Sequence, residues 1–223
     1  EVDRDNALLS RGPRFRMDAE MVRDYALAVS GLLSRKMYGP GTKPYQPTGI
    51  WEVVGLAGGD TRNYVQDKGN NLYRRTVYHF WKRMAAPPNM VAFNAPSREY
   101  CAVSRERTNT PLQALITLND PQFVEAARKL AELALIETDG SDQAIIDFVT
   151  DRALSRALKD RELEIVQSSK QHLHKYYQAH ADDAKLLLAV GESKVDESMD
   201  DVILATWTMV CNQILNLDEV LNK

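Results

Sequence analysis

The sequence predicts a mainly α protein: a compact helical domain with a long irregular loop region in its N-terminal half and little or no β structure. Three observations predict this class. Apolar residues recur at helical spacing over most of the second half, a capping residue is followed by proline at two points, and glycine, proline and asparagine crowd residues 39–70. Hydrophobic residues make up 44% of the 223 positions, which is enough to form a core.

The first predicted helix covers residues 18–34. Met21, Tyr25, Ala28 and Leu32 recur on one face of a 3.6-residue period. A Gly-Pro-Gly breaker follows this helix, and the chain then runs to about residue 70 as a long ordered loop with one short apolar patch at 50–54. Aromatic residues within this loop predict that it is partly pinned to the core: they are Tyr45, Trp51 and Tyr64.

Residues 72–83 carry a mixed pattern. Tyr73, Val77 and Phe80 fit a helix, whereas the aromatic and β-branched content would also suit a strand, and we predict a helix here. The pair Pro87-Pro88 ends it, and 89–93 is predicted to form one short turn.

The next helices have the clearest boundary signals. Thr110-Pro111 places a capping hydroxyl before a proline at the first helical position, and Asp120-Pro121 repeats the arrangement. The sequence therefore predicts a short helix to about residue 118, a sharp corner, and a second helix to about residue 137.

Three more helices are predicted in the acidic second half, over about 142–158, 160–180 and 198–217. The last has apolar residues at alternating steps of four and three, the spacing of a seam packed along a neighbouring helix. The seam residues are Ile203, Trp207, Val210, Ile214 and Leu217.

Charge is unevenly distributed along the chain. Residues 1–111 hold 17 Lys and Arg against 11 Asp and Glu, net +6, and residues 112–223 hold 11 against 20, net −9. We interpret residues 1–223 as a single helical domain, or as a loop-rich basic half (1–110) and an acidic helical half (111–223) that pack together. The cations are too scattered for a nucleic-acid site, and no apolar run reaches the length of a membrane span.

Two further features bear on context. The charged start without an initiator Met leads us to expect a fragment of a larger protein. The two cysteines, Cys101 and Cys211, exclude a disulfide scaffold, a four-cysteine zinc site and a CxxCH haem attachment, and leave open one long-range bridge or two free thiols.

Six residues are candidates for binding an acidic ligand. Four of them, Arg74, Arg75, His79 and Lys82, lie in an aromatic-rich segment where neighbouring positive charge would disfavour protonation of the histidine. The alternative is a packing segment whose Arg and Lys side chains reach water.

The other two candidates are Arg105 and Arg107, which precede the first proline-capped helix. Arginine forks bind carboxylate, sulfate or phosphate, so these could form an anion site, and the alternative is an internal network that holds the helix corner. His172, His174 and His180 lack the i, i+4 spacing of a metal pair on a helix. No catalytic signature appears, and no metal or cofactor is predicted for this chain.

Two long motifs carry a family resemblance. The stretch RERTNTPLQAL at 105–115 and NDPQFVEAA at 119–127, with YRR at 73–75 and FNAPSRE at 93–99, resembles the planctomycete-specific C-terminal domain of unknown function found in large exported, cytochrome-c-like multidomain proteins. The resemblance covers nearly the whole chain and offers no catalytic residues to carry over.

The resemblance implies an exported (periplasmic or cell-surface) protein whose upstream domains, among them a cytochrome-c-like one, are partners of this chain. It also implies a setting of sulfated-polysaccharide degradation. The preferred hypothesis is a non-catalytic interaction or scaffold module. The alternatives are a domain that binds or processes sulfated or acidic polysaccharides, and an accessory domain to a haem redox domain.

Overall fold

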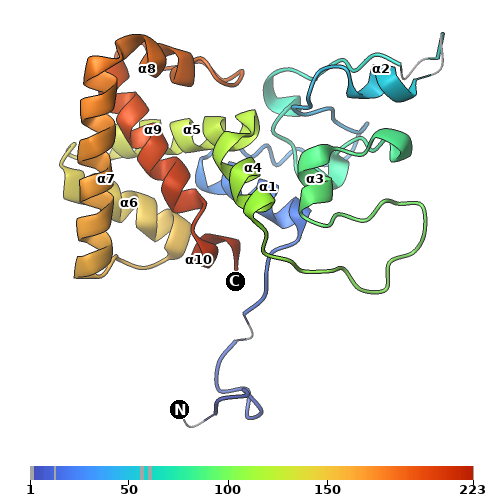
Figure 1. Ribbon diagram of the computed structural model, residues 1–223, viewed down its shortest axis with the longest axis horizontal. Coiled ribbons are helices and arrows are strands. Elements are labelled where there is room, and N and C mark those ends of the chain that lie inside the picture. The colour runs from blue at the N-terminus through green and yellow to red at the C-terminus, as the bar shows by residue number, and fades with distance from the viewer. Residues whose placement is uncertain (1–2, 13, 56–57, 60–61, 223) are drawn as a thin grey trace.

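The computed structural model describes residues 3–12, 14–55, 58–59 and 62–222, and over these residues the chain is helical (Figure 1). The helices are α1 (Ala19–Val29), α2 (Ile50–Val54), α3 (Pro88–Ala92), α4 (Pro111–Asn119), α5 (Pro121–Glu137), α6 (Asp142–Leu154), α7 (Asp160–Ala179), α8 (Ala181–Leu188), α9 (Asp201–Leu215) and α10 (Asp218–Leu221). Three 3₁₀ turns join them in the first half: Gly69–Asn71, Thr76–Tyr78 and Arg83–Ala85. Only isolated β-bridges occur in the described part of the chain, so the predicted mainly α class is confirmed.

The helix α5 is the centre of the structure. It packs against α1 on one side and against α9 on the other, and most of its residues are buried. Two adjacent alanines of α5 lie in different cores. Ala126 belongs to the core shared with α1, and Ala127 belongs to the core shared with α9. Because the alanine side chain is small, α1 and α9 can both pack close to the axis of α5.

The larger core lies among α5, α6, α7, α8 and α9. The predicted seam of α9 is confirmed in its middle, where Trp207, Val210 and Ile214 are buried in this core. Its two outer members, Ile203 and Leu217, are each 43% exposed, since the helix ends at Leu215 and the partner helices do not cover its first turn.

The corner between α4 and α5 forms as predicted. The Thr110 hydroxyl accepts a hydrogen bond from Gln113 N, and Asp120 Oδ1 accepts one from Gln122 N, with proline at the first position of each helix. Each cap satisfies a backbone N–H that has no partner inside its helix, which fixes both helix starts.

The helix predicted over 72–83 is wrong. After a turn at Leu72 and Tyr73 the segment is extended as far as Lys82, apart from the 3₁₀ turn Thr76–Tyr78, because its backbone pairs with distant segments. Ser34 N donates to Tyr73 O at 3.0 Å, Thr42 N donates to Tyr78 O at 2.7 Å, and Phe80 N donates back to Thr42 O at 2.7 Å. Those bonds replace the i to i−4 bonds of a helix.

Several helix ends differ from the predicted ones. The first helix stops at Val29 rather than near residue 34, because Ser30 closes it and Gly31 takes a left-handed φ of 76°. Likewise α6 stops at Leu154, where Ser155 has a φ of 57°. Neither α8 nor α10 was predicted from the sequence. Over its described residues, the predicted irregular region contains the short α2 and the start of the 3₁₀ turn Gly69–Asn71.

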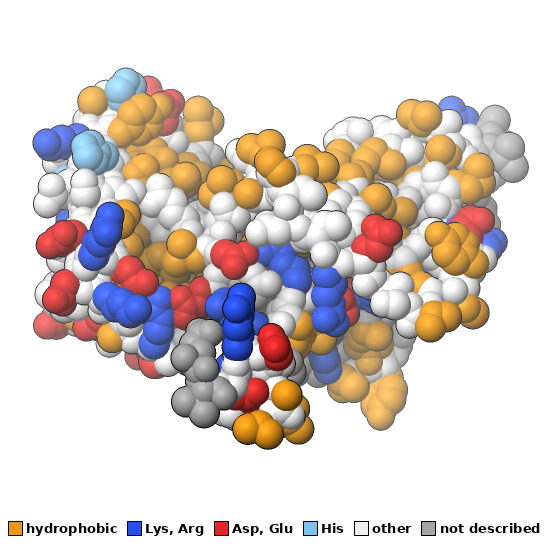
Figure 2. Space-filling view, turned by 60° about the horizontal axis from the view of Figure 1, so that its bottom comes forward, with side chains coloured by type: hydrophobic (Ala, Val, Ile, Leu, Met, Phe, Trp, Pro, Cys, Tyr) orange, Lys and Arg blue, Asp and Glu red, His pale blue; other side chains and the backbone are white. Residues whose placement is uncertain are grey.

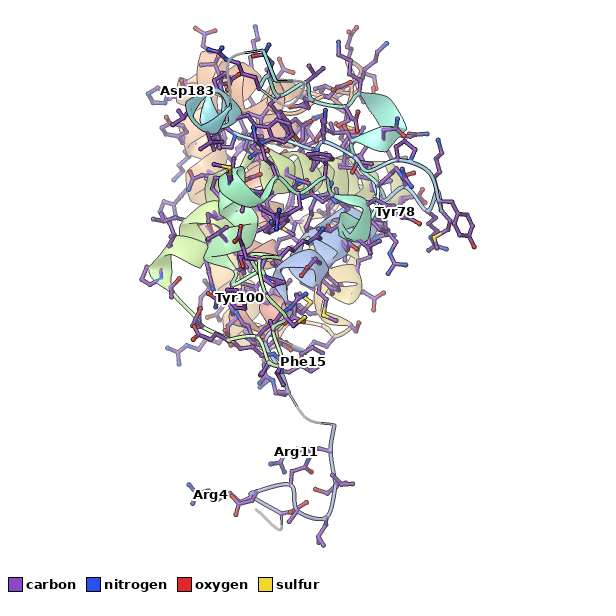
Figure 3. The ribbon with its side chains drawn as sticks, turned by 90° about the vertical axis from the view of Figure 1, so that its right-hand side faces the viewer. Arg4, Arg11, Phe15, Tyr78, Tyr100 and Asp183 are labelled. Carbon is purple, nitrogen blue, oxygen red and sulfur yellow. The ribbon has the colours of Figure 1, made fainter. Side chains whose placement is uncertain are left out.

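An N-terminal arm extends away from the helical body (Figures 1 and 3). Its described tip is closed by its own hydrogen bonds, since Asp3 Oδ2 accepts from Leu8 N and Ser10 Oγ, and Arg11 donates to Asp3 O and Arg4 O. The arm joins the body where Arg16 pairs with Asp218 at 3.1 Å, which brings the first and last described segments together.

Candidate functional site

The six predicted binding residues lie in several different environments, and only Arg105 and Arg107 share a partner among the contacts of the described residues. Arg74 is buried, and its guanidinium donates to Pro40 O at 2.9 Å and Tyr38 O at 2.6 Å while lying 4.0 Å from the centre of the Tyr78 ring. Because both terminal nitrogens of the guanidinium bind backbone carbonyls, Arg74 fixes the loop at 38–40 against the segment around Tyr78.

His79 is buried, and neither of its ring nitrogens has a hydrogen-bond partner. Burial, with smaller contributions from the charges of Arg23 and Arg98, lowers the pKa of His79 from 6.5 to about 3. The predicted disfavouring of protonation is therefore found in the structure, and its main cause is burial, which disfavours the charged form.

Two of the remaining cations rest beside aromatic or acidic groups. Lys82 Nζ lies 4.9 Å from the centre of the Trp51 ring, a cation–π contact. Arg75 is half exposed and lies 3.8 Å from Asp24 on α1. These contacts place Lys82 beside α2 and Arg75 beside α1.

Arg105 and Arg107 lie together at the start of α1. Arg105 binds both carboxylate oxygens of Glu20, at 2.6 and 3.3 Å, and Arg107 lies 3.8 Å from Asp18 and over the Phe15 ring. Arg105 is also 3.8 Å from Asp18. The arginines thus tie the loop before α4 to the start of α1.

Sequence reasoning missed a buried carboxylate on α5. Glu125 is fully buried, and its Oε1 accepts hydrogen bonds from Tyr73 Oη at 2.8 Å, Glu192 N at 2.9 Å and Ser193 N at 2.6 Å. Its Oε2 accepts one from Tyr45 Oη at 2.9 Å. Burial and the neighbouring carboxylate raise the pKa of both phenols, which keeps them protonated as donors.

A buried arginine on α1 forms a second such network. The Arg23 guanidinium donates to Leu72 O at 2.8 Å, to Arg74 O at 2.7 Å and to Thr76 Oγ1 at 3.0 Å, and its Nε donates to Gln122 on α5. Burial lowers the pKa of Arg23 to about 10, so the side chain stays charged at neutral pH. Both networks join the loop-rich first half to α5.

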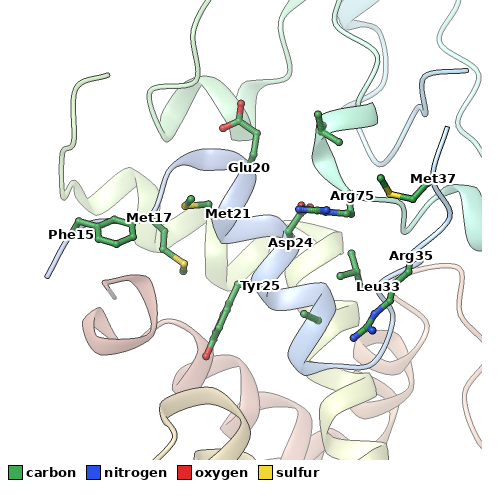
Figure 4. Close-up of a pocket in the computed structure, with 12 residues that line it drawn as sticks. Phe15, Met17, Glu20, Met21, Asp24, Tyr25, Leu33, Arg35, Met37 and Arg75 are labelled. Carbon is green, nitrogen blue, oxygen red and sulfur yellow. The ribbon is translucent and has the colours of Figure 1, made fainter. Parts of the chain in front are cut away.

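An open groove of about 720 Å³ runs along the outer face of α1 (Figure 4). Its lining is mostly apolar and includes three methionines. The lining residues are Phe15, Met17, Glu20, Met21, Asp24, Tyr25, Ala28, Leu33, Arg35, Met37, Arg75 and Val77.

The groove gives α1 two apolar faces. Val22, Ala26 and Val29 face the core, whereas Met21, Tyr25 and Ala28 line the groove on the other side. The apolar face predicted from the sequence is this outer one, and Met21 is 47% exposed there. An apolar stripe on a helix normally packs against a partner, and this predicted stripe was the feature of the sequence that corresponds to the groove.

The polar groups of α1 already have partners within the chain. Glu20 is bound by Arg105, and Asp24 accepts from Thr76 N at 2.8 Å and from Thr76 Oγ1 at 2.6 Å. In Figure 4, Arg75 points toward Asp24, while Arg35 lies apart from it. Arg35 is exposed and has no ion-pair partner among the described residues.

The two cysteines are unpaired and lie in different surroundings. Cys101 is exposed and Cys211 is fully buried in α9, and both are free thiols, which settles the alternative that the sequence left open. Burial raises the pKa of Cys211. Over the described residues, no three His, Cys, Asp or Glu side chains are grouped in a way that could hold a metal ion.

Charge on the surface is mixed rather than gathered. On the face in Figure 2, basic and acidic side chains lie interspersed instead of forming one basic stripe. Within the described residues, no helix combines the length and the apolar character needed to cross a bilayer.

These features define a class of protein: a helical domain held together by buried polar networks, with an open apolar groove along α1. The family described as PSD1, a protein of unknown function (DUF1553), matches residues 1–169, and the chain belongs to this family. No curated protein and no solved structure matches the chain significantly.

Proposed function

We propose that this chain is a non-catalytic interaction module of an exported multidomain protein, and that the groove along α1 is the surface on which another domain of the same polypeptide docks. The observation that carries the proposal is the second apolar face of α1. Met21 on α1 and Met37 in the exposed loop at 35–41 are 47% and 52% exposed in the groove. Contiguous exposed apolar surface of this kind marks interaction sites.

The composition of the groove suits a protein surface as its ligand. Methionine side chains are flexible and polarisable, and they recur in surfaces that accept apolar side chains of varied shape. The charged groups of the walls are few, and Glu20 and Asp24 already have partners. A docking domain would therefore bury apolar area without leaving these carboxylates unpaired.

The polysaccharide alternative has less support. A sulfated or acidic glycan requires cations that converge on one cleft, whereas Arg74 and Arg105 are engaged by backbone carbonyls and by Glu20. Binding of the chain to a sulfated polysaccharide at physiological salt, lost in a folded Arg105→Ala/Arg107→Ala variant, would replace the docking proposal with the glycan one.

Methionine oxidation tests the docking proposal. The isolated chain and the longer protein with its neighbouring domains are exposed to dilute peroxide, and sulfoxide formation is followed by mass spectrometry. Met84 is 74% exposed and lies outside the groove, so it serves as the internal control. We expect Met21 and Met37 to oxidise several-fold more slowly, relative to Met84, in the longer protein. Equal ratios in the two samples would overturn the proposal.

A further inference from the structure

The floor of the groove is one face of α1, on which Met21 and Ala28 are exposed and Tyr25 is half-buried. Met21, Tyr25 and Ala28 lie at i, i+4 and i+7 of α1, and at a rise of about 1.5 Å per residue they span roughly 10 Å. Ridges at this spacing receive the side chains of a second helix packed alongside, and the small side chain of Ala28 permits a close approach. An occupant of two to three helical turns would cover this length.

The ends of the groove differ in charge. Phe15 and Met17 line one end, and Leu33, Arg35 and Met37 line the other (Figure 4). Two carboxylates lie between these ends, and both have partners. Glu20 accepts a hydrogen bond from Arg105, and Asp24 accepts one from Thr76 N and lies 3.8 Å from Arg75. The exposed Arg35 is therefore a cation in the groove lining that has no ion-pair partner among the described residues.

We propose that the groove binds an amphipathic α-helix with an apolar stripe and with an aspartate or glutamate at the end that lies over Arg35. This inference rests on the proposed docking function and adds the secondary structure and the charge of the docking segment. The apolar stripe would pack against Met21, Tyr25 and Ala28, as in other helix-in-groove complexes, and the carboxylate would set the direction of the helix.

Fluorescence anisotropy with three labelled synthetic peptides tests the inference on the 223-residue chain. All three have the same apolar content. The first is an amphipathic helix with two glutamates at one end, the second carries lysines in their place, and the third has the first peptide's residues in a scrambled, non-amphipathic order. We expect the acidic helix to bind about tenfold more tightly than the basic helix at low salt, and the scrambled peptide to bind weakest.

Variants locate the effect. Arg35→Glu should reverse the preference between the acidic and basic helices, whereas Lys36→Glu, an equal charge change at an exposed residue outside the groove lining, should leave the acidic helix preferred. Ala28→Arg fills the groove from an exposed position and should abolish binding of every peptide; its thermal unfolding and circular dichroism show whether it is folded.

The outcomes separate this inference from the proposed function. Equal binding of the acidic and basic helices, lost in a folded Ala28→Arg variant, would overturn the acidic-helix inference and leave groove docking in place. Binding that survives in Ala28→Arg would place the contact outside the groove and overturn both. Absence of binding by all three peptides would overturn the inference, while the oxidation experiment decides on the docking function independently.

Discussion

Gly191 lies against the carboxylate of Glu125, so that a Cβ at position 191 would lie 2.5 Å from Glu125 Cδ and 2.6 Å from Oε1. The glycine also has a φ of 95°, which L side chains rarely adopt. The closeness exists because the amides of Glu192 and Ser193 donate to that carboxylate. The connection between α8 and α9 is thus shaped around a buried charge on α5.

This contact predicts a large effect of Gly191→Ala. The methyl group must displace the carboxylate that four hydrogen bonds hold, and the backbone strain adds to this cost. We expect a loss of roughly 2–5 kcal/mol in the free energy of unfolding, measured by urea titration. Gly140→Ala is the matched control, because Gly140 has a φ of 80° but nothing within 4 Å of its Cβ position, and it should cost about 1 kcal/mol. Equal losses in the two variants would contradict the clash.

Helices whose signals are local could be predicted from the sequence. The corner between α4 and α5 is encoded by Thr110-Pro111 and Asp120-Pro121, because a cap and a fixed proline φ act within one turn. The middle of the α9 seam follows equally from its spacing. The helices that end at Val29 and Leu154 are each followed by a residue with a left-handed backbone conformation. A glycine such as Gly31 predicts such a conformation from the sequence, whereas Ser155 does not.

The rest depends on partners far away in the sequence. Residues 72–83 have helical spacing, yet Arg23, Ser34 and Thr42 engage their backbone and hold it extended. Neither this pairing nor the burial of Glu125 can be read from local pattern, because a buried carboxylate has the same local sequence as an exposed one. Tyr45 was predicted to pin the loop to the core, but its partner Glu125 was not. The outer face of α1 was visible as an apolar stripe, and only the structure showed that it lies open.

Arg23→Leu should destabilise the protein strongly. The substitution keeps apolar bulk but leaves the carbonyl oxygens of Leu72 and Arg74 without their buried donor. We expect a loss of about 3–5 kcal/mol in the free energy of unfolding. Arg75→Leu, at a half-exposed residue that makes only a 3.8 Å contact, should cost less than about 1 kcal/mol. Comparable losses would show that the buried network contributes nothing specific.

The two helix caps should differ in strength. Asp120 Oδ1 accepts from Gln122 N at 3.0 Å and Oδ2 accepts from Asn89 at 3.1 Å, whereas the Thr110 hydroxyl accepts from Gln113 N at 3.4 Å. Asp120→Ala should therefore cost about 1–2 kcal/mol and Thr110→Ala about 0.5–1 kcal/mol in chemical denaturation. Asp120→Asn preserves a side-chain acceptor and should recover much of the loss. The reverse ranking of the two alanine variants would refute the geometric argument.

His79 should make the protein sensitive to mild acid. The pKa of His79 is about 3 in the folded protein, compared with the ordinary value of 6.5 that we take for the unfolded chain. Between pH 3 and pH 6.5, His79 therefore binds a proton in the unfolded chain but not in the folded one. Stability contributed by the neutral ring is present above pH 6.5 and is lost as the pH falls toward 3, by about 1.4 kcal/mol per pH unit. We compare the wild type with His79→Leu, which cannot titrate. The difference between their free energies of unfolding should shift in favour of the variant by roughly 2–3 kcal/mol between pH 7 and pH 4.5.

Comparing differences removes the contribution of carboxylates that titrate in both proteins, so the shift reports position 79 alone. His172→Leu serves as the control, because His172 is exposed on α7 and hydrogen-bonded only to Ser168 O within its own helix. That variant tests whether the loss of an exposed imidazole alone changes the wild-type pH profile. If His79→Leu follows the wild-type profile, the imidazole takes up its proton in the folded protein near its ordinary pKa. The burial of two unpartnered ring nitrogens would then not govern the titration of this residue.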